Sequence, residues 1–169
     1  MKMKKLIICA ICAICGITTA NAQGKFGHVN IDEVIQAMPE FSKAQTELKT
    51  LSEQYEADLK SMQDEIQKKG EAFEKEKNNL PENIRQRREQ EIQDMIQKYQ
   101  QSYQDNQQAL AKAQQEKMQA IQTKAFDAVK SIGESEGFVY IMQTNSLPYI
   151  STTLSTDVTA KVKAKLGLK

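Results

Sequence analysis

The stretch from Phe41 to Gly133 constrains this chain most, because it consists almost entirely of helix-forming residues. In the two segments 41–77 and 82–132, glycine occurs only at Gly70 and proline does not occur. The one break, Asn78-Asn79-Leu80-Pro81, is typical of a turn. The pattern predicts two helices folded back on each other. With a rise of 1.5 Å per residue they would be about 55 Å and about 75 Å long, so we expect them to protrude from any compact core.

The apolar residues of the first predicted helix recur mostly at alternating steps of three and four, which indicates a narrow coiled-coil seam. They are Phe41, Ala44, Leu48, Leu51, Tyr55, Leu59, Met62, Ile66 and Phe73. The step of four is repeated at Tyr55–Leu59, which locally relaxes the supercoil, and Lys69 occupies a seam position near the tip. The second helix is apolar at its two ends, but between Gln97 and Gln108 seven of twelve residues are Gln or Asn. We interpret the hairpin as well packed near its base and loosely packed further out, since few apolar contacts lower the free energy of local opening. A solvated helix face is the alternative interpretation of the glutamine run.

The two ends of the chain carry the β-strand signals. Residues 26–31 alternate apolar and polar, residues 138–142 form a β-favouring apolar run, and 147–151 follow a turn as a second short strand. We also predict a short helix over 33–38 capped by Asp32, and a final helix capped by Ser155 or Thr156. Strands from both ends can meet at the base of the hairpin.

Such a sheet is too small to be a stable core alone, and oligomerisation is the simplest remedy. We therefore predict a mainly α fold with a small β body. A long antiparallel helical hairpin, a coiled-coil-like arm, protrudes from a small β-sheet oligomerisation domain built from both chain ends. The candidate residues for assembly through this body are Phe26, Val29, Ile31, Val139, Ile141 and Ile150.

The first 22 residues have the composition of a secretory signal peptide. A basic start precedes an apolar run from Leu6 to Ile17, which is too short to span a bilayer, and Ala20-Asn21-Ala22 matches a cleavage site. We expect cleavage after Ala22. The chain then divides into a signal peptide at 1–22, a β-rich body at 23–40 and 134–169, and an arm at 41–133 with its tip near 78–82.

Cleavage changes the cysteine content and the charge of the chain. All three cysteines lie within the signal peptide, so the mature chain would form no disulfide and would have no thiol for catalysis or metal binding. Three lysines are also removed, which leaves 20 basic against 22 acidic residues and a net charge of −2. This balance gives no basic excess of the kind that nucleic-acid binding requires.

The residues that enzymes and metal sites require are sparse. His28 is the only histidine, and it lies in a predicted strand without a second histidine or a cysteine nearby. The seven glycines form no phosphate-binding loop, and the carboxylates of the arms alternate with lysines as on a solvated surface. We therefore expect no enzymatic activity, no catalytic or metal-binding residues and no cofactor.

The order of these parts resembles the Skp/OmpH family of periplasmic chaperones. The resemblance rests on the segments 26–34, 128–130, 137–142 and 155–159, on the long helix pair and on the signal peptide. It implies a homotrimer in the periplasm, with a β-rich body and three hairpins around a cavity. It also implies an ATP-independent holdase, a chaperone that keeps unfolded outer-membrane β-barrel proteins from aggregating.

The residues of the arm are compatible with that function, because dispersed Met, Tyr and Phe side chains adapt to many unfolded chains. The candidate client contacts are Phe73, Met95, Tyr99 and Tyr103, with ordinary hairpin packing as the alternative for each. Basic residues also gather on both sides of the tip and suggest a weak contact with anionic lipid or lipopolysaccharide. They are Lys75, Lys77, Arg85, Arg87 and Arg88. A solvated helix end, balanced by neighbouring glutamates, is the alternative.

Two other functions compete with the holdase. One is a structural or tethering coiled coil of the cell envelope, in which the arms act as spacers; the weak, Gln-rich seam argues against a rigid spacer. The other is a module that binds lipid or polysaccharide through the basic tip or the C-terminal lysines. Suppression of aggregation separates the holdase from the tether, and binding to vesicles or polysaccharide at physiological salt separates the third function.

Overall fold

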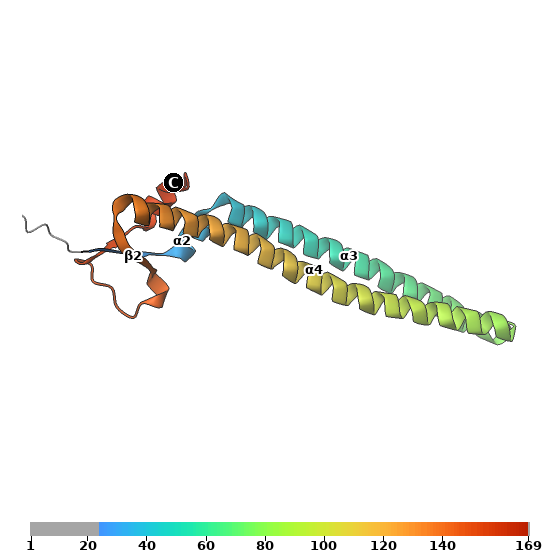
Figure 1. The fold of residues 1–169 in the computed structure, drawn as a ribbon. Helices are drawn as coiled ribbons and strands as arrows, with labels where there is room; N and C mark the ends of the chain where they lie inside the picture. Colours follow the sequence, from blue (N-terminus) through green and yellow to red (C-terminus); the bar gives the residue numbers. More distant parts are fainter. Residues whose placement is uncertain (1–23, 169) are drawn as a thin grey trace, which may run out of the picture.

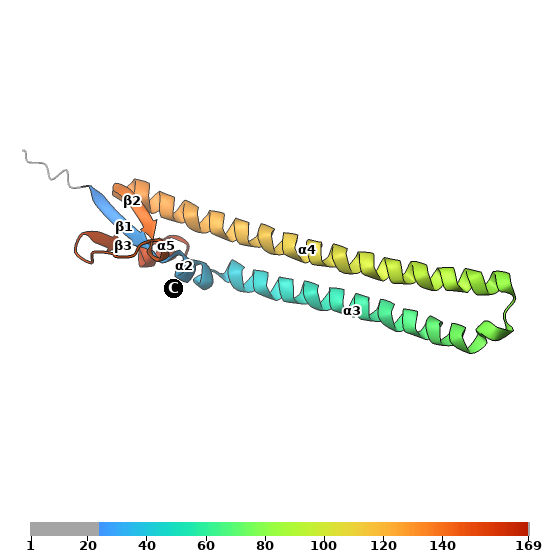
Figure 2. The same cartoon turned by 90° about the horizontal axis from the view of Figure 1, so that it is seen from below.

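A long hairpin of two helices extends from a small body in the computed structural model, which describes residues 24–168 (Figures 1 and 2). The predicted signal peptide lies outside the described residues. In chain order the elements are β1 (Lys25–Val29), α2 (Ile31–Ala37), α3 (Pro39–Glu76), a 3₁₀ turn (Lys77–Asn79), α4 (Glu82–Glu136), β2 (Phe138–Gln143), a second 3₁₀ turn (Thr144–Ser146), β3 (Ser155–Asp157) and α5 (Thr159–Lys165). Helices α3 and α4 are the arm, and the other elements gather at one end of it.

The predicted antiparallel hairpin is confirmed, and its two helices join through the 3₁₀ turn Lys77–Asn79. Helix α3 begins with Pro39 in its first turn, where a missing N–H costs nothing. At the tip, Pro81 lies just before α4 rather than as its first residue. Helix α4 continues past Gly133 and ends at Gly137, whose φ of 70° is a left-handed conformation that glycine adopts without strain.

The sheet has three parallel strands in the order β2-β1-β3, so the N-terminal strand lies between the two C-terminal ones. Phe26 pairs with Tyr140 on one side and with Ser155 on the other. The hairpin is the connection from β1 to β2, and it returns the chain to the body so that β2 runs parallel to β1. A small sheet built from both chain ends is therefore confirmed, and each outer strand has one edge unpaired within the described chain.

Three local predictions for the body are wrong. Residues 147–151 form no strand, because Pro148 has no N–H to donate to a ladder and the segment pairs with nothing in the sheet. The third strand is instead Ser155–Asp157, so Ser155 and Thr156 do not cap the last helix. Asn30, rather than Asp32, caps α2, with its side-chain oxygen accepting a hydrogen bond from the backbone N–H of Glu33 at 3.2 Å.

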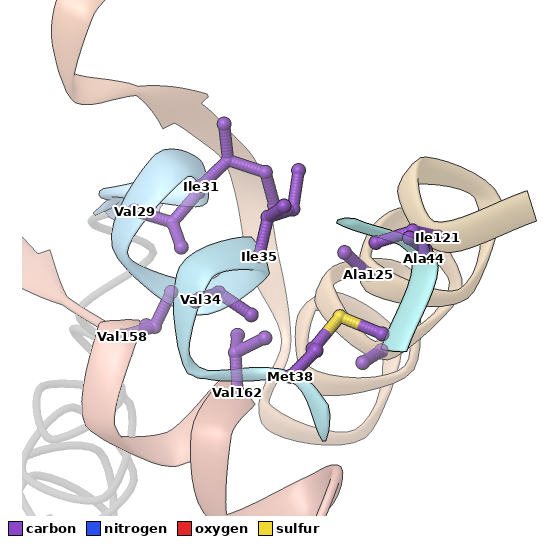
Figure 3. Close-up of a cluster of buried hydrophobic side chains, with 11 residues drawn as sticks. Val29, Ile31, Val34, Ile35, Met38, Ala44, Ile121, Ala125, Val158 and Val162 are labelled. Carbon is purple, nitrogen blue, oxygen red and sulfur yellow. The ribbon is translucent and has the colours of Figure 1, made fainter. Parts of the chain in front are cut away.

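A single apolar core joins the body to the base of the hairpin (Figure 3). Val34, Val158 and Val162 have no exposed surface, and they come from α2, the start of α5 and α5 itself. Ala44 of α3 and Ile121 and Ala125 of α4 belong to the same cluster. Both helices of the arm are therefore anchored in the core that also holds the sheet.

Ion pairs tie the chain ends to the last turn of α4. Glu136 accepts hydrogen bonds from Lys161 of α5 at 2.6 Å and from Lys25 of β1 at 2.9 Å. These two ammonium groups lower the pKa of the Glu136 carboxyl. A third pair joins α5 to α2 through Lys163 and Glu33 at 2.5 Å.

Met38 offers a test of the core, because its side chain is 1% exposed between α2 and α3. We expect Met38→Ala to lower the free energy of unfolding by about 2–5 kcal/mol through lost burial and an unfilled cavity. The neighbouring exposed substitution Gln36→Ala should change it by less than about 0.5 kcal/mol. Urea unfolding measures both, and equal effects would contradict the core assignment.

Glu136 offers a test of the ion pairs through pH. Because its pKa is lowered in the folded state, the ionised carboxylate stabilises the fold above its ordinary pKa of 4.5, and this stabilisation is lost as the pH falls through the folded-state value. We expect the melting temperature of Glu136→Gln to fall less than that of the unmodified chain between about pH 6 and about pH 3. Glu134→Gln is the matched control, since Glu134 only pairs with Lys130 on the surface at 3.9 Å. If the melting temperatures of Glu136→Gln and of the unmodified chain changed in parallel with pH, the ion pairs of Glu136 would not contribute to stability in this way.

Candidate functional site

Four ion pairs cross between the two helices of the arm, and all lie near its ends. Glu40–Lys124 and Glu47–Lys117 join the helices near the base. Lys69–Glu91 and Glu76–Arg88, the latter at 2.7 Å, join them near the tip. Between Glu47 and Lys69, no ion pair crosses the hairpin within the described chain. Exposed pairs of this kind set the register of the helices more than their stability.

The titration of these groups reflects their partners. The hydrogen bond from Lys117 lowers the pKa of Glu47, and the one from Lys124 lowers that of Glu40. Lys69 and Glu91 act on each other, so the pKa of Lys69 is raised and that of Glu91 is lowered. The carboxyl groups of Glu40, Glu47 and Glu91 therefore stay ionised, and the Lys69 ammonium stays protonated, over the physiological pH range.

Between its charged ends the hairpin is held by an apolar seam that is only partly covered. In α3, no residue between Ala44 and Phe73 is buried, and in α4 none is buried before Ile121. The seam residues Tyr55, Leu59 and Met62 are all half-buried. Few buried contacts hold this part of the arm, and its apolar side chains remain accessible.

The four candidate client contacts occupy different environments. Phe73 is only 8% exposed and packs inside the hairpin, as the alternative interpretation expected. Met95 and Tyr99 are half-buried, whereas Tyr103 is 48% exposed. The structure adds Ile96, which is also exposed. Ile96 directly follows Met95, and two adjacent helical residues cannot both lie on one narrow apolar stripe. This adjacency indicated that one of the two side chains would be exposed, which the sequence analysis did not recognise.

Two neighbouring hollows open between the helices in the outer half of the arm. One has a volume of about 270 Å³ and is lined by Phe73 and Ile92, and the other, of about 250 Å³, by Ile66 and Met95. Lys69 and Glu91 line both. The two hollows are lined by apolar side chains and by charged side chains of both signs. Such a lining suits weak contact with varied polypeptides.

The tip residues are largely paired with neighbouring carboxylates. Lys77 binds Glu74 at 2.6 Å, Arg88 binds Glu76, and Arg85 binds Glu82. For Lys75 and Arg87 no ion pair occurs among residues 24–168, and both side chains are exposed. The predicted contact with anionic lipid stays a prediction.

The six candidate assembly residues of the body separate into two groups. Val29 and Ile31 lie in the core of the chain itself, and Ile141 packs against that core. Val139 is 64% exposed on β2. Phe26 stacks on Tyr140, with ring centroids 4.8 Å apart, and Ile150 is half-buried in the segment before β3.

Further large apolar side chains are exposed on the body and on the adjoining end of α4, and the sequence analysis did not single them out. They are Phe126, Tyr140, Met142, Tyr149 and Leu154. The available signal was the run Phe138–Met142, which has no polar residue on either face. A strand with two apolar faces requires cover on both. The body of a single chain therefore presents an apolar surface that suits contact with another polypeptide.

His28 connects two strands. Its Nδ1 lies 2.8 Å from the Oγ of Ser155, which joins β1 to β3. The nearby Asp157 carboxylate accepts hydrogen bonds from the backbone N–H and the hydroxyl of Thr159, so it does not orient the imidazole as in a catalytic triad. No cluster of three or more metal-binding side chains occurs among the described residues. None of the helices described here is long and apolar enough to cross a membrane.

Comparisons with known proteins agree with this architecture. The family model described as outer membrane protein (OmpH-like) matches residues 25–166. Among solved structures, a protein of Caulobacter crescentus CB15 described as an outer membrane chaperone (OmpH-like) superposes with a TM-score of 0.74 at 12% sequence identity. The match covers 85% of this chain and 83% of that one. No curated protein sequence matches significantly. Because the family model spans nearly all described elements, from β1 to α5, the chain belongs to the OmpH-like outer membrane protein family.

Proposed function

We propose that this protein is an ATP-independent holdase of the periplasm, which binds unfolded outer-membrane proteins and prevents their aggregation. Membership of the OmpH-like family supports a chaperone role. The observation that carries the holdase mechanism is the arm, whose apolar seam has no buried residue between Ala44 and Phe73. Partly exposed Met, Tyr and Ile side chains on a loosely packed hairpin can contact many unfolded chains weakly.

The proposed working form is a homotrimer assembled through the body. Two features support assembly: the outer edges of β2 and β3 have no partner in the described chain, and Val139 and its apolar neighbours are exposed. Unpaired strand edges and apolar patches both favour association. In a closed ring the arms would point in one direction and surround a cavity, in which unfolded clients are kept from each other.

The tethering coiled coil remains the alternative. A spacer needs a stiff hairpin, whereas the ion pairs between the helices leave the stretch between Glu47 and Lys69 without cross-links. The partly covered seam in this stretch favours client binding over spacing. A tether would also not require exposed residues such as Tyr103 on the arm.

Val139→Asp tests assembly through the body. Val139 is exposed in the single chain, so the substitution should leave the monomer folded, but burying an unpaired charge in an interface is costly. We expect the mature chain to have three times the mass of one chain by light scattering and Val139→Asp to have the mass of one. Ala160→Asp, on the exposed side of α5, should keep the oligomer. An intact oligomer in Val139→Asp would contradict an interface at β2.

Ile96→Ser combined with Tyr103→Ser tests the arm. The assay dilutes a denatured outer-membrane β-barrel protein from urea and measures its light scattering with and without the mature chain, in the absence of ATP. Stoichiometric protection supports the holdase. Loss of about 1.4 kcal/mol of apolar contact should weaken protection roughly tenfold in the double variant.

The matched control is Gln101→Ser combined with Gln108→Ser, on exposed polar positions of the same helix. It should protect like the unmodified chain, and circular dichroism checks that both variants keep their helices. A stable oligomer that protects no client would favour the tether.

A further inference from the structure

The middle of the arm carries an excess of negative charge. This middle arm consists of residues 48–68 of α3 and 92–116 of α4, between the ion pairs Glu47–Lys117 and Lys69–Glu91. It has eight carboxylates against five lysines, a net charge of −3. The tip beyond it, residues 70–90, has five basic and five acidic residues and is neutral. The excess therefore lies in the stretch where no ion pair joins the two helices of the described chain.

Most of this charge has no counter-ion within the described chain. Three carboxylates pair with a lysine one turn earlier on their own helix: Lys49–Glu53, Lys60–Asp64 and Lys112–Glu116. The five carboxylates without an ion pair among residues 24–168 are Glu56, Asp58, Glu65, Asp94 and Asp105. Only two lysines of the middle arm, Lys68 and Lys98, lack an acidic partner among the same residues. Three of the five carboxylates accept hydrogen bonds from serine or glutamine side chains, but these neutral donors leave the charge uncompensated.

The carboxylates without an ion pair flank the half-covered apolar seam. Residues three and four apart on a helix are neighbours, so Asp58 lies beside Tyr55 and Met62. Glu65 and Met95 line the hollow of about 250 Å³ together with Met62. In Figures 1 and 2 no other described element lies beside this part of the arm. A polypeptide that contacts the seam therefore also meets these carboxylates.

Aromatic rings in the same stretch attract the same kind of group. Three of the five tyrosines, Tyr55, Tyr99 and Tyr103, lie in the middle arm, and Tyr103 is exposed. The face of an aromatic ring attracts ammonium and guanidinium groups. The aliphatic stems of lysine and arginine side chains also cover apolar surface while their charged ends stay in water. Carboxylates and tyrosine rings thus both favour a partner that is rich in lysine or arginine.

We propose that the middle arm binds basic segments of unfolded polypeptides, in which lysine or arginine stands among apolar residues. The apolar side chains of the client contact the seam, and its basic side chains contact the free carboxylates and the tyrosine rings. Acidic clients gain only the apolar contact and are repelled by the carboxylates. This inference rests on the proposed function and adds the class of client to it.

Two short fluorescent peptides test this preference. They share the same apolar residues and serines, and the remaining positions are all lysine in one peptide and all glutamate in the other. Fluorescence anisotropy measures their binding to the mature chain. In about 20 mM salt, we expect the lysine peptide to bind at least about tenfold more tightly than the glutamate peptide. In about 500 mM salt, which screens exposed charges, the ratio should fall below about threefold.

Glu56→Gln combined with Asp58→Asn and Glu65→Gln tests the position of the site. The triple variant removes three of the five free carboxylates and brings the net charge of the middle arm to zero. We expect the ratio in low salt to fall below about threefold, because the lysine peptide loses affinity and the glutamate peptide gains it. Circular dichroism checks that the helices remain intact.

The matched control is Glu71→Gln combined with Glu89→Gln and Asp127→Asn. These side chains are exposed, lie on the same two helices outside the middle arm, and have no ion pair among residues 24–168. The control therefore changes the total charge by the same amount, and it should keep the tenfold ratio. A control that loses the preference as fully as the middle-arm variant would overturn the placement of the site.

The peptides also separate this inference from the proposed function. Equal binding of both peptides, or tighter binding of the glutamate peptide, would overturn the inference and would not affect the proposed holdase. Absence of binding by both peptides would overturn the inference too. In that case the aggregation assay with a denatured β-barrel protein decides whether the proposed function fails with it.

Discussion

The core shared by the body and the base of the hairpin is the interaction on which the rest of the structure depends. Val34, Val158 and Val162 are fully buried there, and Ala44 and Ala125 bring both arms into the same cluster. In proteins, most helical stability comes from the packing of an apolar face rather than from propensity. The body therefore fixes where the two helices of the arm begin, and these helices can be loosely packed beyond it.

The tightly packed base provides the stability of the arm, whereas the proposed function uses its loosely packed part. The arm keeps its register through exposed ion pairs near its two ends, such as Glu47–Lys117 and Glu76–Arg88. Between those ends the seam is half-covered, which would be a defect in a spacer but is an advantage for a surface that binds unfolded chains.

Most of the hairpin could be predicted from sequence because its determinants are local: helix propensity, the seam spacing and the turn at 78–81. Strand β3 could not, since its three residues are polar and it exists only because it pairs with β1. The His28–Ser155 contact that joins these strands spans 127 positions. The same reason explains the body residues. Alternation identified Val29, and the apolar run 138–142 identified Val139, as strand positions, but only tertiary packing determines that one is buried and the other exposed.

Strand β2 links folding to assembly, because the need for cover arises from its composition rather than from any one partner. Parallel strands are normally buried on both faces, and a three-stranded sheet has too few residues to cover itself. Val139, Tyr140 and Met142 remain exposed after the chain has folded.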